Sequence, residues 1–282
     1  MSQNSKDTAT QPRAVSVALQ KGGVGKTTLA INIAERLHAR GHRVLLVDLD
    51  QQGNATEGVG LRDAYDAETH LGDVFGDDAT ATLDDIIQET EWFDVIPANR
   101  DFDALEDRIR TTTFAETWVR KHVVEAVLGD RYDYVVIDSP PNLGALSDAS
   151  LIASQNVIVP LQMSEPSISG LERMVEDQIA PLRQQLDINI LALVPNRLEG
   201  DNEERRIITD IETSPFAENL PALGRSDHFD NPDSPGPGIR KRIAFRRAWR
   251  EGKPVAAYDS ECDQLERLDE LAAIVERGGM DA

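Results

Sequence analysis

The stretch that decides the fold reads Gln20-Lys21-Gly22-Gly23-Val24-Gly25-Lys26-Thr27-Thr28. Before it, residues 14–19 (AVSVAL) form a short apolar run with β-branched side chains, which predicts a buried strand. After it, apolar residues recur with helical spacing over 26–40, and Gly41 supplies a helix stop. A strand, a glycine-rich turn and a helix in this order predict a phosphate-binding loop.

The residue types in this loop suit a nucleoside triphosphate with Mg²⁺. Glycines let backbone N–H groups approach phosphates closely, and the helix that follows presents its positive end. Lys26 adds a positive charge and Thr27 a hydroxyl for the metal. The residues expected to bind the nucleotide are Lys21, Gly22, Gly23, Val24, Gly25, Lys26, Thr27 and Thr28. The general pattern G-x-x-x-x-G-K-[ST] begins with glycine, but Gln20 stands there and a second lysine, Lys21, follows it.

Strand and helix patterns alternate along the rest of the chain. Further strands are expected at 43–48, 93–97, 134–138, 157–161 and 188–194, and helices near 102–110, 113–128, 147–153, 167–186 and 265–275. This alternation predicts an α/β fold, a doubly wound and mostly parallel sheet with helices on both faces. We expect a flexible tail at 1–13, one domain at 14–282 and a loop insertion at 226–238, where prolines and glycines cluster.

Composition excludes several classes of protein. The chain has 282 residues, of which 40% are hydrophobic, and its one cysteine, Cys262, rules out a disulfide scaffold or a multi-cysteine metal centre within one chain. No run approaches the roughly 18 consecutive apolar residues of a membrane span. The N-terminal residues lack the apolar centre of a secretory signal. We therefore expect a cytoplasmic protein that does not act on a membrane.

The acidity of the chain is distributed rather than confined to a tail. Lys and Arg total 29 against 50 Asp and Glu, a formal net charge of −21, with 29 Asp, 21 Glu, 23 Arg and 6 Lys. Such self-repulsion is tolerable where the Debye length is short, about 3 Å at ~1 M salt. The composition favours a halophilic, high-salt cytoplasm, and an ordinary acidic cytosolic protein is the alternative.

Four motifs together resemble one family. Residues 21–28 resemble the deviant Walker A motif of the ParA/MinD ATPases, and VLLVDLDQQGNAT (44–56) resembles their next motif. With YDYVVIDSPPNLG (132–144) and EGKPVAAYD (251–259), the resemblance spans about 14–260 and is closest to the ParA/Soj partition ATPases. It implies the P-loop NTPase fold, with ATP and Mg²⁺ as cofactors.

The resemblance also implies roles for individual residues. Lys21 would be the signature lysine, which reaches across an ATP-sandwich homodimer to the partner's phosphates and, with Lys26, stabilises charge there. Asp50 would orient or activate the attacking water, with Gln51 where the family usually has proline. Asp138, at the end of an apolar strand, would hold Mg²⁺ largely through water, and Asp48 would support the metal shell together with Thr27.

Two further segments have predicted binding roles. Asn196 stands where family members use asparagine for the adenine edge, and a plain turn residue is the alternative. Residues 240–253 carry a local charge of +6 in this acidic chain, which favours nonspecific DNA as the partner. Pairing with the protein's own carboxylates is the other interpretation. The basic residues are Arg240, Lys241, Arg242, Arg246, Arg247, Arg250 and Lys253.

The combined prediction is a DNA partition ATPase, slow on its own and stimulated by a centromere-binding, ParB-like protein. It would cycle between a monomer and an ATP-bound dimer that associates with the nucleoid. A MinD-like positioning ATPase acting on a membrane or another cargo is the alternative, although acids outnumber bases in the C-terminal helix. An amidating or ligase enzyme of the same fold is a third possibility. Iron–sulfur relatives need cysteine pairs, which Cys262 alone does not supply.

Overall fold

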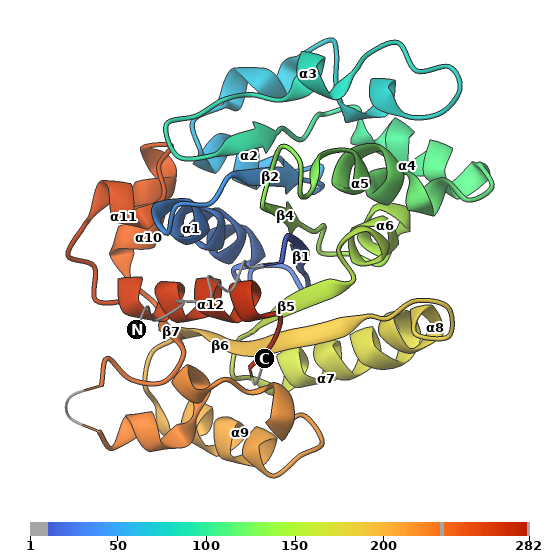
Figure 1. Ribbon diagram of the computed structural model, residues 1–282. Helices are drawn as coiled ribbons and strands as arrows, with labels where there is room; N and C mark the ends of the chain where they lie inside the picture. Colours follow the sequence, from blue (N-terminus) through green and yellow to red (C-terminus); the bar gives the residue numbers. More distant parts are fainter. Residues whose placement is uncertain (1–10, 232–233, 281–282) are drawn as a thin grey trace, which may run out of the picture.

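One parallel sheet organises the computed structural model, which describes residues 11–231 and 234–280 (Figure 1). The strand order is β3-β2-β4-β1-β5-β6-β7, and neighbouring strands of the sheet run parallel. The strands are β1 (Arg13–Val17), β2 (Val44–Asp48), β3 (Asp94–Ile96), β4 (Tyr134–Asp138), β5 (Asn156–Leu161), β6 (Asn189–Leu198) and β7 (Ile239–Arg240). This confirms the predicted doubly wound α/β architecture.

Both faces of the sheet are covered, which explains why its strands are apolar throughout. Because side chains alternate along a strand, neighbouring residues enter different hydrophobic clusters. Leu46 and Val136 pack with α1 (Lys26–Ala39) and α12 (Leu265–Arg277). Leu45 and Ile137 pack with α4 (Phe102–Thr111) and α6 (Ala145–Ser154). A third cluster lies around β5 and β6 and includes residues of α7 and α9.

Most of the remaining α-helices are short. They are α2 (Asn54–Gly58), α3 (Leu83–Ile86), α5 (Glu125–Val127), α7 (Glu165–Arg173), α8 (Ala180–Leu182), α9 (Asn202–Glu212), α10 (Ile243–Arg250) and α11 (Val255–Tyr258). Two segments predicted as single helices, 113–128 and 167–186, are divided by π-helical turns at Val119–Val124 and Met174–Ile179. Hydrophobic periodicity finds such helices but does not distinguish an i→i+5 turn from an α-helical one.

The N-terminal segment and the loop at 226–238 differ slightly from the prediction. Residues 1–10 of the expected tail lie outside the described residues, and β1 begins at Arg13, one residue earlier than expected. The expected loop at 226–238 begins with a 3-10 turn at Ser226–Phe229, and its residues 232 and 233 also lie outside the described part.

The topology places a crevice at the carboxyl edge of the sheet. β1 leads into α1 on one face, whereas its neighbour β4 leads into α6 on the other face. Where adjacent parallel strands connect to helices on opposite faces, the loops diverge and leave room for a ligand. The loops that follow β1, β2, β4 and β6 therefore converge on one site.

Candidate functional site: a phosphate loop and its surroundings

The loop between β1 and α1 has the backbone conformation that phosphate binding requires. Gly23 and Gly25 adopt φ angles of 77° and 96°, a left-handed region that favours glycine. Gly25 is also the N-cap of α1, where no described side chain caps the helix and the first turn holds no acid. The first N–H groups of a 14-residue helix are therefore left for an anion.

Lys26 lies in the floor of this loop. Its side chain is buried, and its Nζ donates to the carbonyl of Lys21 at 3.0 Å. Burial lowers the pKa of Lys26, while the carboxylates of Asp138 and Asp50 oppose that shift. The ammonium is thus held near two acids and at the N-terminus of α1, a position suited to an anion such as phosphate.

Asp138 has the surroundings of a cation ligand. It ends β4, is completely buried, and receives no hydrogen bond of normal geometry from any described residue. Burial raises the pKa of Asp138 well above its usual range, with Asp48 adding to the shift and the nearby Thr27 hydroxyl opposing it. A buried carboxylate without donors is costly unless a cation compensates it. These surroundings fit Mg²⁺ held between Asp138 and Thr27.

Asp48 lies opposite Asp138 in the β2–β4 register, yet its oxygens are occupied. They accept hydrogen bonds from the backbone N–H and hydroxyl of Thr56, both at 2.8 Å, and from the N–H of Asp50 at 3.2 Å. Burial raises the pKa of Asp48 to about 7. Asp48 therefore shapes the loop after β2, and its place in the magnesium shell remains a prediction.

Asp50 sits in a tight turn that faces the phosphate loop. Its Oδ1 accepts the N–H of Gln52 at 3.0 Å, and its carbonyl accepts the N–H of Gly53 at 2.8 Å. Burial raises the pKa of Asp50, and the charge of Lys26 partly offsets this. Only 7% of Asp50 is exposed, and it lines the same cavity as Lys26 and Thr27. This position suits a carboxylate that orients water against a bound phosphate.

A cavity of about 950 Å³ extends from the phosphate loop to the segment before and within α10. Asn196 forms part of its wall, is buried, and donates from Nδ2 to the carbonyl of Val24 at 2.8 Å. That bond leaves Oδ1 of the amide as an acceptor. The cavity is large enough for a nucleotide. It is lined by Gly22, Gly23, Gly25, Lys26, Thr27, Thr28, Asp50, Asn196, Arg197, Leu198, Arg240, Lys241, Arg242, Ile243, Phe245, Arg246 and Trp249, among others.

Comparison with known proteins agrees with this geometry. A family model described as an AAA domain matches residues 12–191. The chain is 32% identical to the sporulation initiation inhibitor protein Soj of Bacillus subtilis over 267 residues, which cover 94% of this chain and 98% of Soj. It is also 32% identical to the chromosome partitioning protein ParA of Caulobacter vibrioides, over 89% of this chain and 88% of that protein. This chain belongs to the ParA/MinD-type P-loop ATPases.

A similar protein is also known from its solved structure. Cobyrinic acid a,c-diamide synthase from Mycobacterium smegmatis, solved with ADP and magnesium, is 29% identical. The match covers 86% of this chain and 92% of the synthase, with a TM-score of 0.69. Within 11–231 and 234–280, none of the helices combines the length and apolar character of a membrane span.

Lys21, which the resemblance predicts to be the signature lysine, is turned onto its own chain. Its Nζ donates to the hydroxyl of Ser167 at 2.8 Å and to that of Ser164 at 3.4 Å. Ser164 is the N-cap of α7, and Ser167 is fully buried. To reach a partner's phosphates, Lys21 must leave these two hydroxyls.

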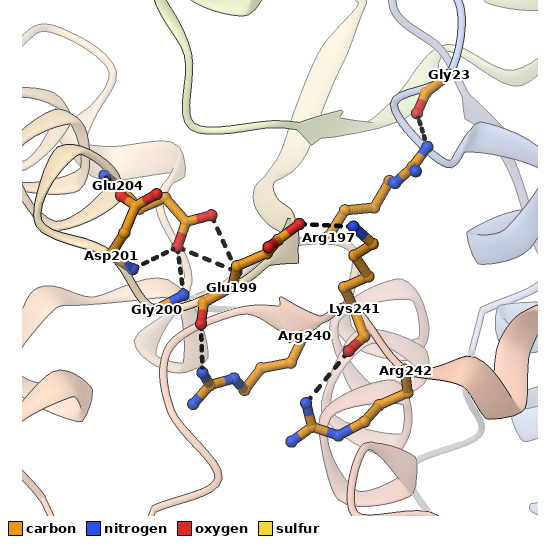
Figure 2. A network of polar contacts seen from close by, with 9 residues as sticks. All are labelled: Gly23, Arg197, Glu199, Gly200, Asp201, Glu204, Arg240, Lys241 and Arg242. Atoms are coloured by element: carbon orange, nitrogen blue, oxygen red, sulfur yellow. Dashed lines mark hydrogen bonds and ion pairs between the residues drawn. The ribbon is translucent and has the colours of Figure 1, made fainter.

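The basic segment 240–253 divides into two parts. In the first part, shown in Figure 2, Arg240 donates to the carbonyl of Glu199 at 2.9 Å and Lys241 forms an ion pair of 2.6 Å with the Glu199 carboxylate. Arg242 forms an ion pair of 2.5 Å with Asp263. The second part has no ion pair with any described residue and is exposed. It comprises Arg246, Arg247, Arg250 and Lys253.

Two residues that the motifs did not indicate organise the loop after β2. Tyr65 donates from Oη to the carbonyl of Gln51 at 2.9 Å, and its ring packs against Gly53, where an added Cβ would lie 2.6 Å from the ring. Trp249 of α10 donates from Nε1 to the carbonyl of Asn54 at 2.8 Å. No sequence pattern marks either contact, because each partner lies in a different element.

Proposed function

We propose that this protein is an ATP-dependent DNA partition ATPase, which cycles between a monomer and an ATP-sandwich dimer that binds DNA without sequence preference. ATP with Mg²⁺ is the ligand of the site. Lys26 and the N–H groups of the loop would hold the phosphates, and Thr27 and Asp138 would hold the metal, which neutralises phosphate charge when bound. Asp50 would orient the attacking water, and the Oδ1 of Asn196 would accept from the adenine amine.

The observation that carries the DNA assignment is the position of the free cations. Arg246, Arg247 and Arg250 lie on α10, and Arg246 also lines the nucleotide cavity. The same helix is tied by Trp249 to Asn54, at the start of α2 just after the Asp50 turn. A movement of the loop at the hydrolysis site would therefore be transmitted to α10 through this hydrogen bond. This link supports control of DNA residence by ATP.

The dimer is proposed from Lys21. An ammonium that reaches the partner's phosphates only on dimerisation would couple association to catalysis, as an arginine finger does. Turnover would be slow in the monomer and stimulated by a centromere-binding, ParB-like partner. ATP-bound dimers would associate with the nucleoid in the cytoplasm.

Co-sedimentation tests the proposal directly. The protein is mixed with nonspecific DNA or with lipid vesicles and compared with ATP, ADP and no nucleotide. We expect ATP-dependent co-sedimentation with DNA and none with vesicles, whereas binding to vesicles alone would support the membrane-positioning alternative. That alternative is disfavoured because the apolar face of α12 (Leu268, Leu271 and Val275) is buried in the cluster that contains α1.

Two double alanine variants, each lacking two arginines, test the role of α10 in DNA binding. Arg247→Ala/Arg250→Ala removes two unpaired cations per protomer, so binding to DNA should weaken at every sequence and the salt dependence should become shallower. Arg62→Ala/Arg110→Ala is the matched control, since those exposed arginines pair with nearby acids. Unchanged DNA binding by the first variant would contradict the assignment of α10.

The similarity to cobyrinic acid a,c-diamide synthase supports one further candidate, an ATP-dependent amidating enzyme. The two functions differ in what stimulates ATP hydrolysis. A small carboxylic acid that raises turnover in the absence of DNA would support amidation. Stimulation that requires DNA and a partner protein would support partition.

A further inference from the structure

Two consecutive residues near the carboxyl end of β6 hold two consecutive carbonyls of the phosphate loop. The amide of Asn196 donates to the carbonyl of Val24, and the guanidinium of Arg197 donates to the carbonyl of Gly23. Figure 2 shows the Arg197 side chain reaching to Gly23. Both side chains also lie against Gly25, where an added Cβ would be 2.3 Å from Asn196 Nδ2 and 3.9 Å from Arg197 Cδ. Side chains of β6 therefore hold the backbone of the phosphate loop in place.

The two hydrogen bonds also fix the direction of the N–H groups in the same peptides. In a trans peptide, the carbonyl of one residue and the N–H of the next point in opposite directions. Holding the carbonyls of Gly23 and Val24 toward β6 therefore turns the N–H groups of Val24 and Gly25 away from it. Neither N–H makes a hydrogen bond of normal geometry to a described acceptor. Successive free N–H groups of this kind form an anion-binding nest.

The backbone of Arg197 departs from ordinary geometry at this point. Its φ angle is 60°, and only two other non-glycine residues in the described part of the chain, Phe114 and Gln155, have a positive φ. Such a conformation costs energy and persists where the surroundings enforce it. Arg197 lies between Asn196 and Leu198, where the pairing of β6 with β7 shifts register. The backbone that follows is held by Glu204, whose carboxylate accepts the N–H groups of Glu199, Gly200 and Asp201 (Figure 2).

We propose that Arg197 is a positioning residue for nucleotide binding, which acts by fixing the orientation of the Gly23–Val24 peptide. It would raise affinity for the phosphates through the loop rather than by contact with the terminal phosphate. The inference rests on the nucleotide-binding part of the proposed function. It is independent of DNA and of dimerisation, so all measurements are made without DNA or a partner protein.

The first experiment compares ATP and ADP. In Arg197→Ala, the dissociation constants of both nucleotides should rise by a similar factor, about tenfold for the loss of one charged hydrogen bond. KM for ATP should rise with little change in kcat, which is the pattern of lost uniform binding. A loss confined to ATP would overturn the proposal, because it would mean direct contact with the terminal phosphate. Unchanged affinity for both would overturn it as well.

Two further variants separate positioning from folding. Arg197→Gly removes the guanidinium but also relieves the left-handed backbone, so its melting temperature should equal or exceed that of Arg197→Ala while its nucleotide affinity stays equally low. Arg197→Lys keeps one cationic donor and should recover part of the affinity. Arg205→Ala is the charge-matched control, since that guanidinium binds Asp230 and not the loop. Full nucleotide affinity in Arg197→Gly would contradict the proposal.

Discussion

Single side chains in the site divide between those proposed to meet the nucleotide and those that shape the loops around it. Lys26, Thr27 and Asp138 belong to the first group, because each is positioned at the phosphate loop with a charge or hydroxyl directed to that chemistry. Tyr65 and Arg197 belong to the second, because each donates to a backbone carbonyl of a site loop. Motifs predicted the first group, whereas the second was visible only in three dimensions.

Asp50→Ala should separate binding from hydrolysis. Removal of the carboxylate leaves the phosphate loop intact, so ATP should still bind while kcat falls by about 10²–10⁴, a typical loss for a general base. The DNA-associated dimer should then accumulate. Lys26→Ala serves as the contrasting variant, since it should abolish nucleotide binding itself. Normal turnover by Asp50→Ala, measured as phosphate release, would remove the catalytic role of Asp50.

Tyr65→Phe should slow hydrolysis without weakening ATP binding. Gln51 stands where the family usually has proline, and the Tyr65 hydroxyl holds the Gln51 carbonyl in its place. Loss of one neutral hydrogen bond should lower kcat by about 3- to 10-fold, with KM little changed. Tyr258→Phe is the matched control, because that hydroxyl is exposed and has no described partner. Equal kcat in both variants would show that the turn needs no such support.

At the level of helices and strands, the apolar strands and the helices with a marked apolar face near the two ends of the chain were predictable, whereas two helices between residues 202 and 250 were not. β4 matched its predicted bounds, and α1 and α12 matched within a few residues. α9 was missed although Asp201 and Glu204 form a capping box at its start, a signal that a closer search for helix N-termini would find. α10 was interpreted only by charge. Its residues Ala244 and Ala248 are buried, which is how eight residues dock as a helix.

The C-terminal end of α12 should contribute pH-dependent stability. Glu276 accepts two hydrogen bonds from Arg40 and one from His42, and Arg40 holds the pKa of that carboxyl below its usual range. A lowered pKa means that the folded state binds the proton less readily than the unfolded state. The contribution is therefore present above about pH 4.3, the unperturbed pKa of Glu, and is lost as pH falls through the folded value.

Glu276→Gln tests this contribution. The variant should melt below the wild type at pH 7, and the difference should shrink as pH falls below the unperturbed pKa. Glu266→Gln, on the same helix and exposed, removes the same charge without a described partner and should show no such trend. If the melting temperatures of Glu276→Gln and the wild type differed by the same amount at every pH, the charge of Glu276 would not be the source of the stabilisation.

For the whole molecule, charge and topology act separately. The parallel sheet follows from the alternation of strands and helices along the chain. The net charge of −21 instead determines how the stability of that fold depends on salt concentration. Many surface arginines pair with carboxylates, for example Arg43 with Asp133 at 2.7 Å. Such exposed pairs contribute little to the free energy of unfolding, because water and salt screen them. Acidic residues still outnumber basic ones by 21 in the chain.

Salt should therefore stabilise the folded protein. Between ~0.1 M and ~2 M KCl the Debye length falls from about 10 Å to below 3 Å, which screens the self-repulsion of the acidic surface. We expect the melting temperature to rise across this range, and partial unfolding on dialysis to low salt, both followed by circular dichroism. A melting temperature independent of salt would support an ordinary acidic protein instead of one from a high-salt cytoplasm.

The phosphate loop was predictable because its chemistry is carried by neighbouring residues. Gly23, Gly25, Lys26 and Thr27 act through local backbone conformation and side-chain type, which a short stretch of sequence specifies by itself. The contacts that brace the site are different in kind. Tyr65 is 14 residues from Gln51, Arg197 is 174 from Gly23, and Trp249 is 195 from Asn54. No periodicity links residues so far apart, so only the packing of β6, α10 and the loop after β2 around one crevice could bring them together.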